Sequence, residues 1–243
     1  MRAAEPAVEA VIFDWGGTLT PWHTIDFDEE SQVLARAAVD ADETAAALLR
    51  AANEAVWGRS RDHHTSATLA DVFGEAGLRH DEDLLEAYRE FWSPHTLIDS
   101  DAEPLLTRLR GDGVKVGVLS NTLWPRAWHE ELFRRDGVLE LIDGAVYTSE
   151  IPWTKPSPEA FAAAMAAVGV KDPAHCVFVG DRLFDDIWGA RNAGMRAIHV
   201  PHSDIPLQQV GHTEGEPDAV VQRLGQVYDV VATWGTPGEA ATG

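Results

Sequence analysis

The 243-residue chain contains a single cysteine, Cys176, and only three lysines. One cysteine excludes an intrachain disulfide and any zinc site built from several cysteines. Acidic residues outnumber basic ones by 40 to 19, which gives a formal net charge of −21. Because that charge repels the phosphate backbone of nucleic acids, we expect no nucleic-acid partner.

Long apolar runs are absent as well. No run approaches the roughly 20 residues that a helix needs to cross a bilayer. Met1–Pro6 also lacks the apolar segment of a signal peptide. We therefore expect a cytoplasmic protein with no membrane partner. Hydrophobic residues still make up 45% of the chain, enough for a sizeable core. No residue pattern decides between a monomer and a homodimer.

Short apolar segments recur along the chain with little polar alternation, which is typical of parallel strands buried on both faces. They are Ala7–Phe13, Val114–Ser120, Gly144–Thr148, Cys176–Gly180 and Ala197–Val200. Helical patterns separate them. The clearest is Ala160–Val168, with Ser157 as the expected N-cap, Pro158 in the first turn and Gly169 as the C-terminal cap. These repeated units predict an α/β fold, a doubly wound parallel sheet with helices on both faces.

Residues 21–103 interrupt this alternation. They contain no convincing strand, but they include four amphipathic or alanine-rich segments: Glu29–Ala38, Asp42–Val56, Ser66–Ala76 and Asp81–Phe91. We predict an all-helical cap domain inserted after the first strand, while residues 1–20 and 104–234 form the core domain. The two junctions would then lie close together and act as hinges. The small, polar tail, residues 235–243, is predicted to be disordered.

The segment Asp14-Trp15-Gly16-Gly17-Thr18-Leu19-Thr20 follows the first predicted strand. Asp14 stands at the carboxyl end of that strand, ahead of a Gly-Gly turn whose backbone N–H groups can hold phosphoryl oxygens. A carboxylate in this position suits nucleophilic attack on phosphorus. The structural alternative is an aspartate that only caps the turn.

Two further segments carry groups that suit a phosphoryl site. Ser120 and Asn121 end the second predicted strand, where a hydroxyl and a backbone N–H can hold a phosphoryl oxygen, although Ser120 could also cap the next helix. Lys155 precedes Pro156, whose ring restricts the lysine to an extended backbone. A lysine fixed there can neutralise charge on a phosphoryl group and on Asp14.

Three carboxylates, Asp181, Asp185 and Asp186, follow the fourth predicted strand. Carboxylates so close together repel one another unless a cation joins them, and oxygen ligands of this kind favour Mg²⁺. Asp185 is as readily interpreted as an N-cap for the next helix.

In order and spacing, these motifs resemble those of the haloacid dehalogenase (HAD) superfamily of hydrolases with an inserted helical cap. The resemblance spans nearly the whole chain through Asp14–Thr20, Leu119–Asn121, Lys155–Phe161 and Val179–Met195. It implies that Asp14 is the nucleophile and forms an aspartyl-phosphate. It also implies Mg²⁺ as cofactor, held by Asp14, the Gly16 carbonyl and Asp181, with Asp186 as a ligand of the outer shell or the residue that orients Lys155.

Gly16 departs from the family pattern. In phosphatases of this family an aspartate at that position is the general acid and base, a role that contributes typically about 10²–10⁴-fold to the rate. Three explanations remain open. They are a substrate with a good leaving group, a slow relative that only binds a ligand, and substitution by another residue, with candidates His23, Asp26, Asp28, His63 and His64.

We therefore expect a Mg²⁺-dependent hydrolase of small-molecule phosphate monoesters. One alternative is a metal-independent haloacid dehalogenase, which also lacks the second acidic residue but typically replaces the aspartate that Asp181 supplies. The other is a catalytically weak binding protein. Phosphonoacetaldehyde hydrolase chemistry needs a lysine in the cap, whereas the first lysine here is Lys115.

Aromatic residues are plentiful near the motifs, since nine tryptophans occur in the chain. Aromatic walls would favour a flat or apolar leaving group; alternatively, the rings only pack between cap and core, which we expect for Trp15. The residues expected to contact substrate are Gly17, Trp22, His23 and Trp124. Trp153 also lies near the motifs, just before Lys155. Three arginines are candidate contacts for an anion: Arg61, Arg126 and Arg182.

Overall fold

The computed structural model describes residues 7–22, 25–39, 41–201 and 212–237. A six-stranded, wholly parallel sheet of order β3-β2-β1-β4-β5-β6 forms its centre. The strands are β1 (Ala10–Phe13), β2 (Lys115–Ser120), β3 (Gly144–Tyr147), β4 (Cys176–Gly180), β5 (Arg196–His199) and β6 (Ala219–Val220). The five predicted strands are confirmed with slightly shifted ends. The two-residue β6 was not predicted.

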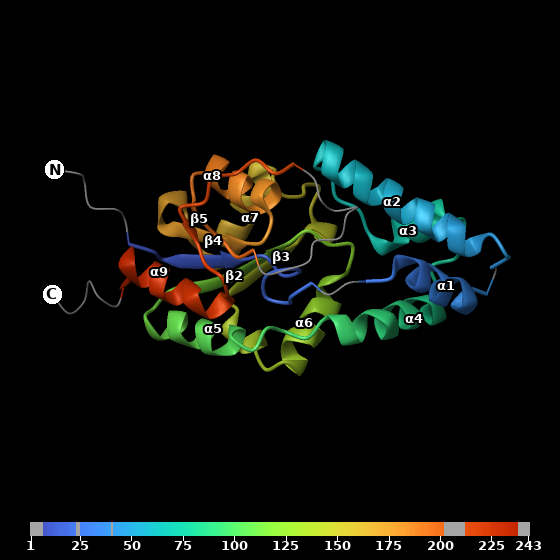
Figure 1. Cartoon of the computed structure of the whole chain (residues 1–243), viewed down its shortest axis with the longest axis horizontal. Helices are drawn as coiled ribbons and strands as arrows, with labels where there is room; N and C mark the ends of the chain where they lie inside the picture. Colours follow the sequence, from blue (N-terminus) through green and yellow to red (C-terminus); the bar gives the residue numbers. More distant parts are fainter. Residues whose placement is uncertain (1–6, 23–24, 40, 202–211, 238–243) are drawn as a thin grey trace.

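Helices cover both faces of the sheet, as the doubly wound prediction requires (Figure 1). One face carries α5 (Ala102–Gly111), α6 (Arg126–Arg135) and α9 (Val227–Thr233), and the other carries α7 (Pro158–Val168) and α8 (Gly189–Asn192). Strand β1 shows why both faces must be covered. Val11 and Phe13 pack in the apolar cluster on the face covered by α5, α6 and α9, whereas Ala10 and Ile12 pack in the cluster on the face covered by α7 and α8.

Short helices complete the core. They are one π-helix, η5 (Leu183–Trp188), and the 3₁₀ turns η1 (Ser93–His95), η2 (Leu139–Leu141), η3 (Thr148–Glu150), η4 (Pro173–His175) and η7 (Leu224–Gln226). The predicted helix after Ser157 is confirmed as α7, and Gly169 ends it with a φ of 78°. The expected cap by the Ser157 side chain is wrong, because its hydroxyl donates to the Glu159 carboxylate instead.

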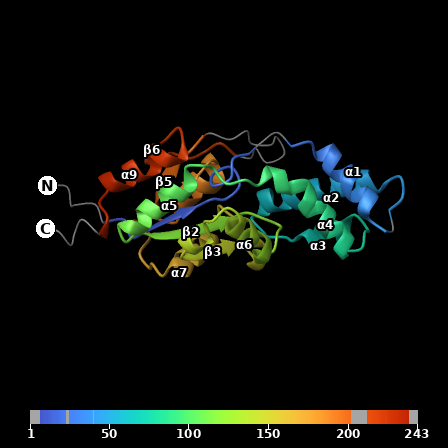
Figure 2. The same cartoon turned by 90° about the horizontal axis from the view of Figure 1, so that it is seen from below.

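The predicted helical cap is present and consists of α1 (Phe27–Ala37), α2 (Ala45–His63), α3 (Leu69–Glu75) and α4 (Glu82–Trp92). These helices enclose an apolar cluster of their own, to which, among the described core residues, Leu123 and Trp124 contribute buried side chains. The views in Figures 1 and 2 both place the cap beyond the carboxyl ends of the strands. The cap therefore lies over the edge of the sheet where the predicted site residues gather.

The two cap junctions lie side by side, since the Asp99 N–H donates to the Leu19 carbonyl at 2.8 Å. Helix α5 begins at Ala102 and packs in the core, so the core resumes slightly before the predicted boundary at residue 104. Three residues of the predicted tail, 235–237, are described: Gly235 accepts a hydrogen bond from the Val8 N–H, and Thr236 is buried. Residues 238–243 lie outside the described residues. Among those described, no helix combines the length and apolar composition needed to cross a membrane.

Candidate active site

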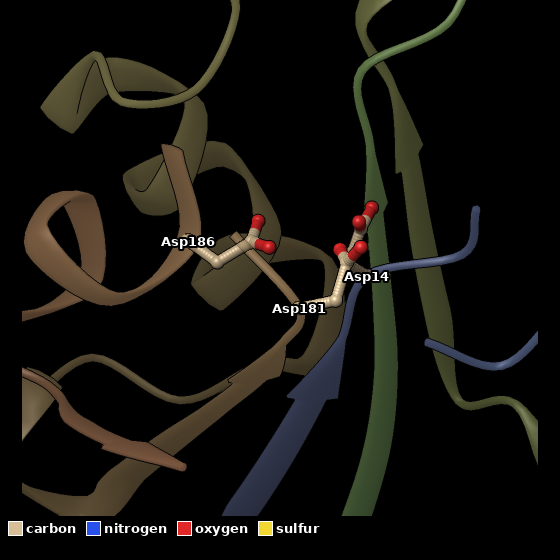
Figure 3. Close-up of side chains that lie close together, drawn as sticks. All are labelled: Asp14, Asp181 and Asp186. Atoms are coloured by element: carbon tan, nitrogen blue, oxygen red, sulfur yellow. The ribbon is translucent and has the colours of Figure 1, made fainter. Parts of the chain in front are cut away.

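Three neighbouring strands bring the predicted site residues to one edge of the sheet. Asp14 directly follows β1, Ser120 ends β2 and Asp181 directly follows β4. Because these strands are parallel and adjacent, their carboxyl ends meet. Figure 3 shows the carboxylates of Asp14 and Asp181 close together, with Asp186 approaching from η5. The arrangement confirms that residues far apart in sequence form one cluster.

Lys155 joins two of these carboxylates. Its ammonium lies 2.7 Å from Asp14 Oδ1 and 2.7 Å from Asp186 Oδ1, and the residue is only 3% exposed. Burial acts to lower the pKa of Lys155, but the charges of Asp14 and Asp186 outweigh burial and raise it. Lys155 is therefore a fixed positive charge beside the expected nucleophile. Asp186 also accepts a hydrogen bond from the Arg182 N–H at 2.9 Å, so both of its oxygens are occupied.

Asn121 holds Lys155 in place through the backbone. Its side-chain NH₂ donates to the Lys155 carbonyl at 3.1 Å, and its Oδ1 accepts from the Lys155 N–H at 2.8 Å. The sequence predicted that Asn121 would contact the phosphoryl group. In the structure the Asn121 side chain binds the Lys155 backbone instead, so Asn121 is a positioning residue for Lys155. A phosphoryl contact from the Asn121 backbone N–H stays a prediction.

Asp181 has the environment of a metal ligand. Neither oxygen of its buried carboxylate has a hydrogen-bond partner in the described part of the chain. Asp14, Asp181 and Asp186 each offer an oxygen, and these atoms lie within 4.8 Å of one another. A buried carboxylate without donors is costly, and a divalent cation would satisfy it. The residues therefore fit Mg²⁺, with Asp14 and Asp181 best placed to bind it because both oxygens of Asp186 are occupied.

The turn after β1 is shaped around Asp181. A Cβ on Gly17 would lie 2.3 Å from Asp181 Oδ2, and Gly17 has a φ of 96°, so a larger residue would be excluded on both counts. The Gly17 N–H donates to the Thr20 carbonyl at 2.7 Å rather than toward a ligand. Gly17 is therefore needed because a side chain at this position would collide with Asp181. A contact between Gly17 and substrate stays a prediction.

Counted in their ionised forms, the side chains of the cluster carry a formal excess of negative charge. Four carboxylates (Asp14, Asp181, Asp185 and Asp186) surround two cationic side chains (Lys155 and Arg182), a formal excess of two. Burial raises the pKa of Asp14 to about 6, although Lys155 opposes it, and burial raises the pKa of Asp181 as well. Asp185 lies inside η5 and pairs with Arg182, so the expectation that it is an N-cap is wrong. A divalent cation would balance the cluster.

A cavity between cap and core opens onto this cluster. Of the residues predicted for the site, it is lined by Asp14, Gly16, Trp22, Asn121, Trp124 and Lys155. Arg182, Asp185 and Glu30 also line it. Five aromatic residues of the cap and Trp124 of the core form an aromatic wall in this cavity, which consists of Trp22, Phe27, Trp57, Tyr88, Trp92 and Trp124. Trp153 is 41% exposed and is not among the lining residues. His23 lies outside the described residues.

The sequence pattern of the haloacid dehalogenase-like hydrolases matches residues 8–194, most of the chain. The chain belongs to the haloacid dehalogenase-like hydrolases. It is 28% identical to a glyceraldehyde 3-phosphate phosphatase of Methanopyrus kandleri over 231 residues, covering 92% of this chain and 97% of the relative. The phosphatase relatives agree with the HAD phosphatase branch expected from the motifs.

Solved structures of the family have the same fold. A HAD phosphatase from Thermococcus onnurineus superposes with a TM-score of 0.67 at 23% identity, covering 92% of this chain and 98% of that one. An L-2-haloacid dehalogenase from Xanthobacter autotrophicus gives 0.64 at 22% identity, covering 93% and 98%. Because a phosphatase and a dehalogenase fit about equally well, the fold does not choose between the two reactions.

The position of the family's missing acid lies against Trp22. A Cβ built on Gly16 would lie 3.3 Å from Cζ2 of the Trp22 ring, so a larger residue there would require the indole to shift by a few tenths of an ångström. The described substitutes proposed from the sequence do not line the cavity. Asp26 is the N-cap of α1, Asp28 pairs with Arg50, and the remaining two, His63 and His64, end α2.

Among the described carboxylates of the cap, Glu30 lines the cavity. Its place in the site was not predicted from the sequence. It lies on α1 and is 5% exposed. The Trp92 indole N–H donates to Glu30 Oε1 at 2.7 Å, and burial raises the pKa of Glu30 from 4.5 to about 7. The available signal was its spacing: Glu30 falls on the same helix face as Phe27 and Leu34, where an apolar residue is expected.

Replacing Asn121 tests its role as the support of Lys155. We expect Asn121→Ala to lower the free energy of unfolding by about 1–3 kcal/mol, because two buried backbone groups of Lys155 lose their partners. Urea unfolding measures the change. Asn192→Ala, at an exposed position of α8, is the matched control and should change stability by no more than roughly 0.5 kcal/mol. Equal effects of the two substitutions would contradict the assignment.

The buried carboxylate of Glu30 should make stability depend on pH. Its pKa is higher in the folded protein, so the folded state binds more protons than the unfolded chain between pH 4.5 and about 7. The free energy of unfolding therefore falls as the pH rises through that range. Glu30→Gln removes the effect, and we expect the variant to exceed the wild type by about 2–3 kcal/mol at pH 8 and to match it near pH 4.5.

Urea unfolding at several pH values measures this difference. Glu29→Gln, on the adjacent exposed position of α1, serves as the control and should follow the wild-type pH profile. A Glu30→Gln profile that runs parallel to that of the wild type would show that Glu30 ionises in the folded protein as it does in the unfolded chain.

Proposed function

We propose that the protein is a Mg²⁺-dependent phosphatase of small-molecule phosphate monoesters that acts through an aspartyl-phosphate on Asp14. The observation that carries the proposal is the buried cluster of Asp14, Lys155 and Asp181. A nucleophilic carboxylate stands beside a fixed ammonium and beside a carboxylate whose oxygens have no donor. A dehalogenase that acts at carbon needs no metal, so a site with an excess of two negative charges favours phosphoryl transfer.

The residues divide the work as follows. An oxygen of Asp14 attacks phosphorus, the bond from phosphorus to the ester oxygen breaks, and the alcohol leaves as an alkoxide that takes a proton from solvent. Water then attacks the phosphorus, and the bond to Asp14 breaks to release phosphate. Lys155 and Arg182 balance the charge of the phosphoryl oxygens. Asp14 and Asp181 would hold Mg²⁺, which would supply further positive charge to stabilise the phosphoryl oxygens. Ser120 and the Gly16 carbonyl keep their expected roles as phosphoryl and metal contacts.

The test is phosphate release with and without metal. We expect para-nitrophenyl phosphate to be hydrolysed with Mg²⁺ and not with excess chelator. Asp14→Asn should lower kcat by at least about 10³-fold, because it removes the nucleophile. Asp229→Asn, an exposed position on α9, should retain wild-type activity. Glyceraldehyde 3-phosphate, named for the Methanopyrus relative, belongs in the same panel. Metal-independent release of chloride from 2-chloropropionate, without phosphate release from any ester, would replace this proposal by a dehalogenase.

The glycine at position 16 makes a separate prediction about leaving groups. Without an acid to protonate the ester oxygen, kcat/KM should be at least about 10²-fold higher for para-nitrophenyl phosphate than for n-butyl phosphate. The phenolate leaves unaided, whereas an alkoxide does not. Initial rates on the two esters under identical Mg²⁺ measure the ratio. Comparable values would mean that another group donates the proton.

A further inference from the structure

The cap half of the cavity combines an aromatic wall with one buried carboxylate, and the polar residues Asn53, His95 and Thr96 complete its lining. The wall is continuous: the Trp92 ring centre lies 6.3 Å from that of Trp22, 6.2 Å from Tyr88 and 5.8 Å from Trp124. Glu30 is attached to the middle of this wall by its hydrogen bond from Trp92. Aromatic faces carry a partial negative charge that attracts cations. When it is ionised, the carboxylate of Glu30 adds a negative charge at the same place, and a bound cation would favour that ionised form.

The structure leaves the charge of Glu30 without a cationic partner. Within the described part of the chain the Glu30 carboxylate forms no ion pair, and its hydrogen bond from Trp92 comes from an uncharged donor. Arg50, whose charge favours the ionised carboxylate, is bound instead to Asp28 and Glu54. A buried carboxylate in this condition is destabilising. A cation brought by a ligand would remove that cost.

Other ligands fit this half of the cavity less well. A neutral flat ring would cover the aromatic wall but would leave Glu30 buried and uncompensated. A second anionic group would be repelled by it. A cation surrounded by aromatic faces and one carboxylate satisfies both features together.

We infer that the cap half of the cavity binds an organic ammonium group, so that the substrate is the phosphate monoester of an amino or quaternary ammonium alcohol. The inference rests on the proposed phosphatase function for the phosphate end of that substrate. There Lys155 and Arg182 face the same cavity as the aromatic wall. With Mg²⁺ held by Asp14 and Asp181 at the phosphate end, the two ends of the cavity would be complementary to a zwitterion.

A cationic alcohol also answers the absence of an acid at Gly16. An ammonium group two carbons from the ester oxygen stabilises the alkoxide that leaves, because opposite charges attract strongly in a water-poor cavity. The substrate then supplies part of the stabilisation that a protonating aspartate would otherwise give.

Binding tests the site without requiring catalysis. Choline and its uncharged isostere 3,3-dimethylbutan-1-ol are titrated separately into the full-length protein while tryptophan fluorescence is recorded. We expect the wild type to bind choline at least tenfold more tightly than the isostere. Glu30→Gln should bring the two affinities together, and the control Glu29→Gln should keep the preference. Trp57→Leu, which removes one face of the wall, should also weaken choline more than the isostere.

Hydrolysis tests the same preference in the ester. We expect kcat/KM for phosphocholine to exceed that for 3,3-dimethylbutyl phosphate at least tenfold, and the ratio should fall toward one in Glu30→Gln. Equal affinities for choline and the isostere in the wild type, or an unchanged preference in Glu30→Gln, would overturn the inference. Equal losses on both esters in Glu30→Gln would also overturn it, because they would make Glu30 an acid or base.

The two proposals can fail separately. If choline binds in a Glu30-dependent manner while no phosphate ester is hydrolysed, the ammonium site stands and the phosphatase function fails. If esters are hydrolysed with Mg²⁺ but without preference for the cationic one, the phosphatase function stands and the ammonium site fails.

Discussion

The burial of the Lys155 ammonium is the constraint on which the rest of the site depends. A lysine 3% exposed is stable only with opposite charges beside it, and here Asp14 after β1 and Asp186 in η5 supply them at 2.7 Å each. Asn121, after β2, fixes the lysine backbone. One residue thus links the segments that follow β1 and β2 to η5, and Asp14, the proposed nucleophile, receives its charge environment from that arrangement.

The same loop connects the site to the cap. Immediately before Lys155, the Thr154 N–H donates to the His64 carbonyl at 3.0 Å, and Ser66 of the cap donates from its N–H to Pro152 at 3.2 Å. The Leu69 N–H, at the start of α3, reaches the Leu123 carbonyl. The cap is therefore held by backbone hydrogen bonds to the segments that carry Lys155 and follow Asn121. These bonds join the cap directly to the segment that precedes Lys155.

The parts of the fold that the sequence predicts are those with local causes. Buried strands are recognisable in the sequence as apolar runs. Asp14 and Asp181 directly follow two such strands, so the parallel sheet brings the two aspartates close together. Contacts between distant segments have no such signal. Nothing near Asn121 indicates that its amide binds the backbone of residue 155. The roles of Glu30 and Trp92 depend on how α1 packs against α4, which only the folded cap determines.

Gly16 shows how one substitution can be understood only from its surroundings. In sequence it is the loss of a catalytic acid. In the structure, the glycine also lets the Trp22 ring lie close to the backbone, because a Cβ at that position would be 3.3 Å from the ring. An aspartate at this position would crowd the indole, so Trp22 would have to shift by a few tenths of an ångström to admit it. A site that gives up proton donation for an aromatic surface suits leaving groups that need little protonation and that bind well to aromatic faces. A cationic alcohol meets both conditions, since its charge stabilises the departing oxygen and attracts the rings.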